Sequence, residues 1–284
     1  MDAQVNMALE PHVAINPSPD VAAAHKLFVF LPGTSGTPEM YRLILRSGAR
    51  RGFHTLGLNY PNPTAVGELC LGSSDPNCFF KVRSEIISGA PLSDLVSVNV
   101  PNSIVTRLTE TVAYLNQHFS DEGWGQYLLS NGQIDWSKVV MSGHSQGGGH
   151  AGLMAKMFSM SRVVYFASPA DWDGSGPAAW VSLPNVTPAV RQYGFTHLDD
   201  DLVPIAKLSL IWPTLGLGAM TTAVNVDNTS PSQFGNSHIF VTNATPRLGG
   251  ISPTHGSTVL DMSTPLAGNG TPVFDPVWAA LCFE

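Results

Sequence analysis

Residues 138–160 read KVVMSGHSQGGGHAGLMAKMFSM, and this stretch decides the fold that we expect for the chain. An apolar run leads into the pentad GHSQG at 143–147, and apolar residues at helical spacing follow. A strand, a sharp turn and a helix in this order place Ser145 on a tight turn that tolerates only small neighbours, hence the glycines two positions before and after it. We therefore expect Ser145 to be a nucleophile exposed at a helix N-terminus, where backbone N–H groups favour a developing negative charge.

Other classes of site are disfavoured by sequence features. A phosphate-binding turn is the alternative for the glycine-rich segment, but it lacks the Lys-Ser/Thr ending of a P-loop. The 284 residues carry 14 Lys and Arg against 21 Asp and Glu, a net charge of −7, so we expect no nucleic-acid partner. No apolar run reaches about 18 residues, so no transmembrane segment is expected. No zinc-like Cys/His spacing occurs, so we expect neither a metal nor an organic cofactor.

Short apolar runs alternate with helix-like stretches, which is typical of a mostly parallel sheet with helices on both faces. The expected strands are Leu27–Leu31, Thr55–Leu58, Val139–Ser142, Val163–Ala167, Tyr193–Leu198 and His238–Thr242. The expected helices are Pro38–Arg51, Asn102–Phe119, Gln146–Met160 and a closing helix within Val273–Leu281. We expect an N-terminal arm at 1–25 and a single domain at 26–284, with no prediction for the oligomeric state.

The segment GHSQGG at 143–148 resembles the nucleophile elbow of esterases and lipases of the α/β-hydrolase fold. A second motif, FVFLPGTSG at 28–36, is similar to the strand and glycine turn that supply an oxyanion donor in that family. The glycines of this motif alone also suit an ordinary strand-ending turn. The resemblance extends over most of the chain from Lys26 onward. It implies the α/β-hydrolase fold, with a loop-rich insertion near the active site and no large cap domain.

The resemblance also implies an oxyanion hole and an order for the catalytic residues. The backbone N–H groups of Gln146 and Thr34 would bind the oxygen of the tetrahedral intermediate, with Ser35 as the alternative to Thr34. In this fold the triad runs in the order serine, acid, histidine. The acid and the histidine are therefore expected after Ser145.

His255 is the expected general base, which takes the proton of the serine hydroxyl. Three other histidines follow the elbow. His150 lies on the helix behind the serine, His197 ends a strand and His238 opens one. His255 follows the last strand and precedes the closing helix, which is the position that this fold gives to the base.

The acidic triplet Asp199–Asp201 is the expected source of the orienting acid. A solvated charge run is the other interpretation, but the triplet lies between a strand and the apolar Leu202-Val203 pair. In related hydrolases the acid commonly stands in a GxxDxxVP pattern, and this register selects Asp200. His197 stands where the family usually has glycine, so Asp201 remains the alternative.

The long connections rich in Pro, Gly, Ser and Asn are expected to surround the binding site. The insertion at 61–101 is the expected cover, and the connection at 168–192 is too short to hold a helical cap. The expected pocket residues are Ser35, His144, Trp172 and Trp180. Such an apolar pocket suits a small-molecule or lipid-like ester. Asp171 and Asp173 are expected to bind an ion or to cap a loop, with little part in catalysis.

Cysteines and glycosylation sequons give a weak indication of compartment. Cys70 and Cys78 bracket the polar loop CLGSSDPNC and are expected to pair if the protein is exported, leaving Cys282 unpaired; two free thiols are the alternative. Sequons stand at Asn185, Asn228, Asn243 and Asn269. A secreted or extracytoplasmic location is slightly favoured over a cytoplasmic one.

The function expected from these residues is hydrolysis of carboxylic esters through an acyl-enzyme. An amide or peptide hydrolase, or an acyltransferase, would use the same residues and remains open, because fold does not fix function. A non-catalytic binding protein of this fold is a further alternative. The complete set of Ser145, Asp200 and His255 favours an enzyme, since a binding protein has no need of it.

Overall fold

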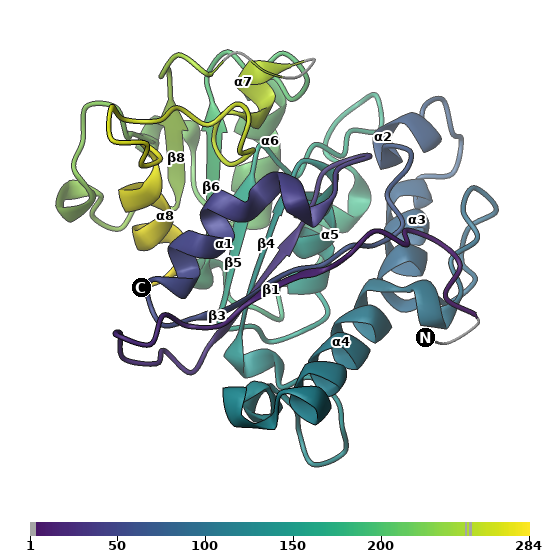
Figure 1. Ribbon diagram of the computed structural model, residues 1–284. Helices are drawn as coiled ribbons and strands as arrows, with labels where there is room; N and C mark the ends of the chain where they lie inside the picture. The colour runs from purple at the N-terminus through teal and green to yellow at the C-terminus, as the bar shows by residue number, and fades with distance from the viewer. Residues whose placement is uncertain (1–3, 248, 250–251) are drawn as a thin grey trace.

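The computed structural model describes residues 4–247, 249 and 252–284, and within them the strands form one sheet in the order β1-β3-β2-β4-β5-β6-β8-β7 (Figure 1). In this described part, β1 runs antiparallel to β3 and all other neighbours are parallel. The strands are β1 (Val13–Ile15), β2 (Leu27–Leu31), β3 (His54–Gly57), β4 (Val139–His144), β5 (Arg162–Phe166), β6 (Gln192–His197), β7 (Val224–Asn225) and β8 (Ile239–Thr242).

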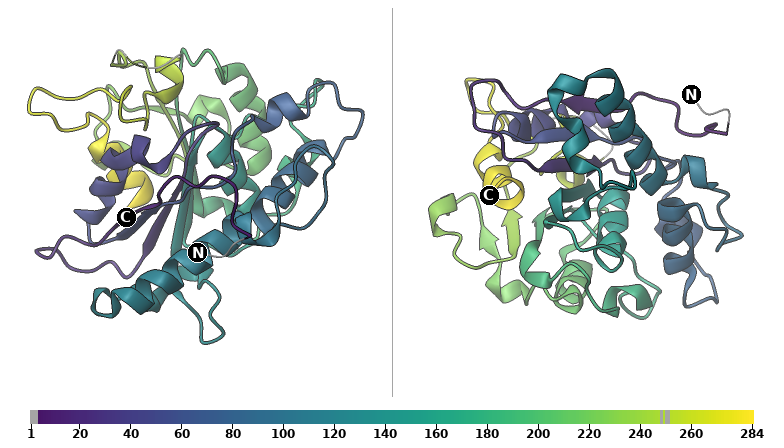
Figure 2. Two further views of the ribbon diagram at one scale, coloured as in Figure 1. Left: turned by 45° about the vertical axis from the view of Figure 1, so that its right-hand side comes forward. Right: turned by 90° about the horizontal axis from the view of Figure 1, so that it is seen from below.

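Helices cover both faces of the sheet (Figure 2). They are α1 (Arg42–Ala49), α2 (Val66–Leu69), α3 (Cys78–Ser88), α4 (Ile104–His118), α5 (Gln146–Ala155), α6 (Ile205–Leu215), α7 (Pro253–Gly256) and α8 (Asp275–Cys282). Side chains alternate along a strand, so Leu27, Val29 and Leu31 of β2 enter the core shared with α3, α4, α5 and α6. Phe28 and Phe30 enter the core shared with α1 and α8. β2 is therefore apolar throughout because both of its faces are buried.

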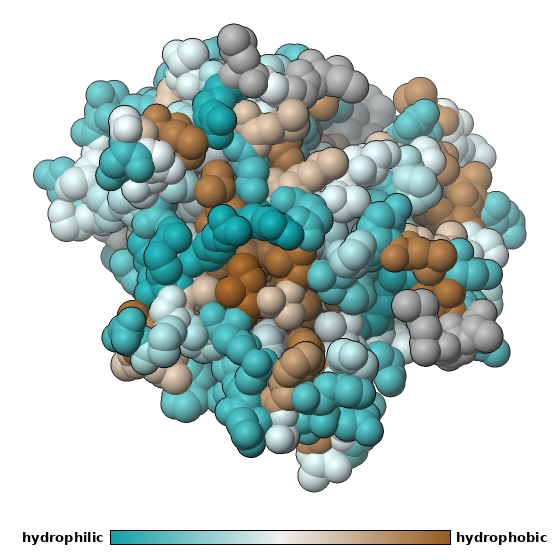
Figure 3. All heavy atoms as spheres, viewed as in Figure 1, coloured by the Kyte–Doolittle hydropathy of each residue, from teal (hydrophilic) through white to brown (hydrophobic). Residues whose placement is uncertain are grey.

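The mostly parallel sheet with helices on both faces, which the sequence predicts, is confirmed. All expected strands are present, β2 with the same bounds and the others within two residues at either end. The connection at 168–192 contains short 3-10 helices and no cap domain. On the face seen in Figure 1, apolar patches interrupt a largely hydrophilic surface (Figure 3). No helix in the described ranges is long and apolar enough to cross a membrane.

The first 25 residues differ from the separate arm that the sequence suggests. Strand β1 forms an edge of the sheet, and three residues are too few for an alternating pattern to reveal a strand. The guanidinium group of Arg107 also donates hydrogen bonds to the carbonyl oxygens of Met7 and Ala8. Residues 1–3 lie outside the described residues. The described part of the arm is thus packed onto the domain.

The insertion at 61–101 contains helices where the sequence suggests mainly loops. Cys70 and Cys78 form a disulfide that joins the end of α2 to the start of α3. Helix α3 lacks a recognisable polar face because Arg83 and Glu85 are buried with its apolar residues. Helix α6 was also not expected from the sequence; Pro213 lies inside it.

Candidate active site

Ser145 lies between β4 and α5 in a backbone conformation that side chains rarely adopt. Its φ of 53° and ψ of −116° turn the chain sharply, and its N–H donates to the carbonyl oxygen of Phe166 at 2.9 Å. A Cβ on Gly147 would lie 2.1 Å from the carbonyl oxygen of Leu31, and one on Gly143 would lie 2.3 Å from the backbone of Gly147. Close packing on both sides therefore requires these glycines and holds the serine in its strained turn.

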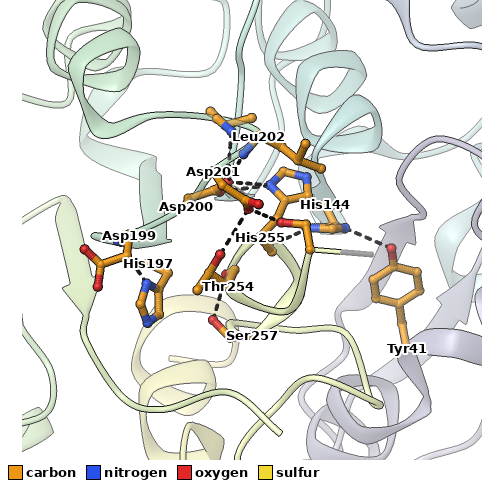
Figure 4. Close-up of polar contacts among 12 residues, drawn as sticks. Tyr41, His144, His197, Asp199, Asp200, Asp201, Leu202, Thr254, His255 and Ser257 are labelled. Carbon is orange, nitrogen blue, oxygen red and sulfur yellow. Dashed lines mark hydrogen bonds and ion pairs between the residues drawn. The ribbon is translucent and has the colours of Figure 1, made fainter. Parts of the chain in front are cut away.

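Asp200 and His255 form a buried pair beside this turn (Figure 4). Asp200 follows β6 and His255 lies on α7, so the carboxyl ends of neighbouring strands bring them to one edge of the sheet. Nδ1 of His255 donates to Oδ2 of Asp200 at 2.8 Å. Oδ1 of Asp200 also accepts hydrogen bonds from the backbone N–H groups of Leu202 at 3.0 Å and Val203 at 2.8 Å. The carboxylate is therefore held in place by three hydrogen-bond donors, one from His255 and two from the main chain.

The two neighbours of Asp200 point elsewhere. Asp199 is exposed, and its backbone N–H donates to Nδ1 of His197 at 3.0 Å. Asp201 is also exposed, and its carboxylate accepts hydrogen bonds from the hydroxyls of Ser252 and Thr254. Asp201 thus anchors the residues before His255 without contacting its ring.

Ser145 and His255 line the same cavity, which has a volume of about 620 Å³. Its apolar lining includes Met40, Val66, Leu202, Val203 and Leu260. Lys207 lies at the same cavity. Among the residues that the structure describes, no hydrogen bond joins the Ser145 hydroxyl to His255; such bonds commonly tighten when substrate binds. A cavity of this size accommodates a small organic molecule next to both side chains.

Thr34 and Gln146 lie side by side in the lining of this cavity. The hydroxyl of Thr34 donates to Oε1 of Gln146 at 2.7 Å. Gln146 is the first residue of α5, so its backbone N–H has no partner within the helix. The N–H of Ser35 donates to the carbonyl oxygen of Asn62 at 2.9 Å, and Nδ2 of Asn62 binds the carbonyl oxygens at both ends of the turn. Because the Ser35 N–H is already engaged, Thr34 is the better placed donor of the two.

His144 lines the cavity but uses both ring nitrogens inside the protein. Nδ1 is 2.9 Å from the Tyr41 hydroxyl, and Nε2 donates to the backbone carbonyl of His255 at 3.0 Å. Burial, with a smaller contribution from the adjacent His255, lowers the pKa of His144 to about 3. The ring is therefore neutral. His144 lines the cavity, as expected from the sequence, but its ring nitrogens are engaged inside the protein and are not available to a substrate.

Trp172 and Trp180 are not among the residues that line this cavity. Trp180 is buried under α5, and its Nε1 donates to Oδ2 of Asp171 at 2.7 Å. Trp172 is half-buried and pairs with Pro177 in an isolated bridge. The expectation that these tryptophans form a wall of the acyl pocket is thus corrected. Trp180 packs in the core instead, where its indole N–H is hydrogen-bonded to Asp171.

A buried ion pair lies next to the turn that carries Ser145, and it was not expected from the sequence. Arg83 of α3 binds Asp171 through Nε at 2.6 Å, and its Nη1 donates to the carbonyl oxygen of Gln146 at 3.1 Å. Asp171 is thus an ion-pair partner, while Asp173 accepts hydrogen bonds from backbone N–H groups of its own loop, as expected for a cap. Arg83 and Asp171 are 88 residues apart, so no local pattern could have linked them.

We compared the chain with known proteins and found solved structures that resemble it at low sequence identity. No protein-family model and no curated protein matches the chain. Apo esterase 2 of Thermogutta terrifontis is 16% identical, with 81% of this chain and 76% of that one covered and a TM-score of 0.40. TT1662 from Thermus thermophilus is 14% identical, covering 82% and 84%, with a TM-score of 0.41. An α/β serine hydrolase homologue from Coxiella burnetii is 13% identical, covering 81% and 79%, with a TM-score of 0.41.

The strand order, the antiparallel edge strand β1 and the sharp turn between β4 and α5 define the α/β-hydrolase fold. The fold implied by the sequence resemblance is therefore confirmed. Many different reactions use this fold, so the chemistry has to be argued from the side chains themselves.

Proposed function

We propose that this protein is a serine hydrolase that cleaves carboxylic esters through an acyl-enzyme. The observation that carries the proposal is the buried Asp200–His255 pair, whose histidine lines the same cavity as the strained Ser145. A serine needs a base to take its proton, and a base needs a carboxylate to hold its tautomer. The Asp200 carboxylate on Nδ1 leaves Nε2 of His255 free to act as that base.

In the proposed reaction, Oγ of Ser145 forms a bond to the ester carbonyl carbon while its proton passes to Nε2 of His255. The backbone N–H groups of Thr34 and Gln146 stabilise the oxyanion. The C–O bond to the leaving group then breaks, and the proton on His255 goes to the departing alkoxide to give the alcohol. Water repeats the sequence on the acyl-enzyme, with its proton taken by His255, and releases the carboxylic acid and free Ser145.

The cavity favours an ester without a large charge on its acyl or alcohol part. Leu202, Val203 and Leu260 supply apolar surface near His255, and Met40 and Val66 extend it. Arg83 and Asp171 at the cavity form an ion pair with an N–O distance of 2.5 Å and neutralise each other. Lys207 is the remaining Lys, Arg, Asp or Glu side chain among the described residues that line the cavity. A neutral small-molecule or lipid-like ester is the substrate class that fits this lining.

Active-site labelling with a fluorophosphonate, followed by p-nitrophenyl esters of increasing chain length, tests the proposal. We expect one label per chain, on Ser145, and turnover that Ser145→Ala abolishes without changing the melting temperature. Labelling of another serine, or no labelling of the folded protein, would refute it. A parallel assay with p-nitroanilides and with added alcohols separates esterase activity from amide hydrolysis and acyl transfer.

We also propose that the protein works in an oxidising compartment, either secreted or extracytoplasmic. The Cys70–Cys78 disulfide supports this, because such bonds persist mainly outside the cytosol.

A further inference from the structure

A directional chain of hydrogen bonds runs from the turn before Thr34 to the main chain of His255 (Figure 4 shows its Tyr41–His144–His255 part). The N–H of Gly33 donates to the Tyr41 hydroxyl at 3.2 Å. That hydroxyl lies 2.9 Å from Nδ1 of His144. Nε2 of His144 reaches the carbonyl oxygen of His255 at 3.0 Å. These three hydrogen bonds thus link the oxyanion turn, the residue directly before Ser145 and the segment that carries the proposed base.

The direction of each bond follows from the chemistry of the groups. A backbone carbonyl only accepts, so the ring proton of His144 must be on Nε2. Burial lowers the pKa of His144 to about 3, so the ring is neutral and Nδ1 is an acceptor. Burial also raises the pKa of Tyr41, so its hydroxyl keeps the proton that it donates to Nδ1. The tyrosine oxygen then accepts from the Gly33 N–H.

We propose that His144 and Tyr41 are positioning residues that fix the main chain of His255 and the oxyanion turn relative to Ser145. The proposal rests on the function proposed above and adds to it the side chains that set the spacing between base, nucleophile and oxyanion donor. Asp200 contacts the ring of His255, so it orients the imidazole. The His144 bond holds the backbone carbonyl of His255, which the carboxylate does not contact.

The placement of His255 makes a second anchor necessary. Its helix α7 has four residues and lies in the connection between β8 and α8, so no sheet hydrogen bonds fix its backbone. His144 directly precedes Ser145, and its side chain is hydrogen-bonded to the main chain of His255. The length of this side chain therefore sets the spacing between the backbone of the nucleophile and that of His255. The rings of His144 and His255 have centroids 4.6 Å apart. A neutral His144 avoids repulsion when His255 takes up the serine proton.

A matched set of variants separates positioning from packing. The amide nitrogen of Gln in His144→Gln can replace Nε2 as donor to His255, whereas Asn in His144→Asn is too short to do so. Tyr41→Phe keeps the ring that packs on Phe30 at 4.6 Å but removes the hydroxyl. We expect His144→Asn and Tyr41→Phe to lower kcat by about 10- to 100-fold, the loss produced by a misplacement of about 1 Å, with KM nearly unchanged. His144→Gln should stay much closer to the wild-type kcat.

A readout without substrate completes the experiment. Proton NMR follows the exchange with water of the Nδ1 proton that His255 shares with Asp200, and ¹⁵N NMR reports the tautomer of His144. We expect the neutral Nε2–H tautomer at pH 7 and faster exchange of the His255 proton in His144→Asn than in His144→Gln.

Each result bears on a different claim. Equal kcat and equal exchange in the Asn and Gln variants would overturn the positioning role, as would activity lost only in proportion to the folded fraction. Wild-type protein that neither hydrolyses esters nor reacts with a fluorophosphonate would overturn the proposed function, while the exchange difference would still support the positioning role. If His144→Asn does not fold, Tyr41→Phe provides the kinetic comparison.

Discussion

Asp200 and His255 are joined by a hydrogen bond of 2.8 Å although 55 residues separate them in the sequence. The carboxylate is almost fully buried, and two backbone N–H groups, from Leu202 and Val203, hold its other oxygen. Its position is therefore set by the main chain that follows β6. Asp201, one residue on, is exposed and hydrogen-bonded to side chains of the segment before His255.

This relationship predicts different effects for the three neighbouring aspartates. Asp200→Asn should lower kcat by up to ~10⁴-fold, because the amide favours the wrong tautomer of His255 while keeping the shape. Asp199→Asn and Asp201→Asn should lose far less activity, since both carboxylates are exposed and neither is hydrogen-bonded to the His255 ring. Steady-state kinetics of the three variants on one ester provide the measurement. A variant Asp200→Asn with near wild-type activity would contradict the assignment.

The sequence was sufficient where a local pattern carries the structure. β2 is recognisable because a strand buried on both faces is continuously apolar, and β4 because it begins with an apolar run. Ser145 is recognisable because its turn demands glycine at two fixed positions. The register toward a Val-Pro pair selected Asp200, and the buried pair with His255 agrees with that choice.

Sequence reasoning was insufficient where the partners are distant or the pattern is hidden. Tyr41 and His144 are 103 residues apart, and nothing near Tyr41 marks it as a hydrogen-bond donor to the elbow. Arg83 and Glu85 of α3 are buried with its apolar residues, so the periodicity of this helix does not resemble that of an amphipathic helix. Trp172 and Trp180 were assigned to the pocket by composition, which does not determine the direction in which a loop packs.

The buried pair of Arg83 and Asp171 predicts strong energetic coupling. Both side chains are 3% exposed, so removing one leaves the other charge buried without its partner. Arg83→Met should lower the free energy of unfolding by roughly 3–5 kcal/mol. The double variant Arg83→Met/Asp171→Leu should be more stable than the single one.

Urea unfolding of the wild type, both single variants and the double variant gives the coupling energy. We expect it to be on the order of 2 kcal/mol. Strict additivity would show that the pair does not act as a unit.

The disulfide between Cys70 and Cys78 is predicted to contribute to stability more than to catalysis. It closes a loop of nine residues, with a sequence separation of 8, for which chain entropy gives about 2–3 kcal/mol. The double variant Cys70→Ser/Cys78→Ser should lose this free energy of unfolding and keep its kcat at a temperature where it is folded. Non-reducing mass spectrometry checks the bond; fully reduced thiols in protein from an oxidising host would rule it out.

Buried histidines predict a loss of stability on mild acidification. Burial lowers the pKa of four histidines: His12 to about 4, His54, His144 to about 3, and His150 well below its ordinary value. Between these values and the pKa of about 6.5 in the unfolded chain, the unfolded state binds more protons than the folded state. The free energy of unfolding therefore falls as the pH drops below about 6.5, by up to ~1.4 kcal/mol per pH unit for each histidine.

One group acts in the opposite direction, and one histidine offers a clean variant. Burial raises the pKa of Asp261 to about 6, so its contribution to stability decreases as the pH rises through 6, but the four histidines outweigh it. His150 is fully buried, and its ring nitrogens have no hydrogen-bond partner among the described residues, so His150→Met removes a titrating group without removing a hydrogen bond. Urea unfolding between pH 7.5 and 4.5 should show a slope above ~1.4 kcal/mol per pH unit near pH 5.5, and a smaller slope in His150→Met. A stability that stays constant from pH 7.5 to 5 would contradict the burial of neutral histidines.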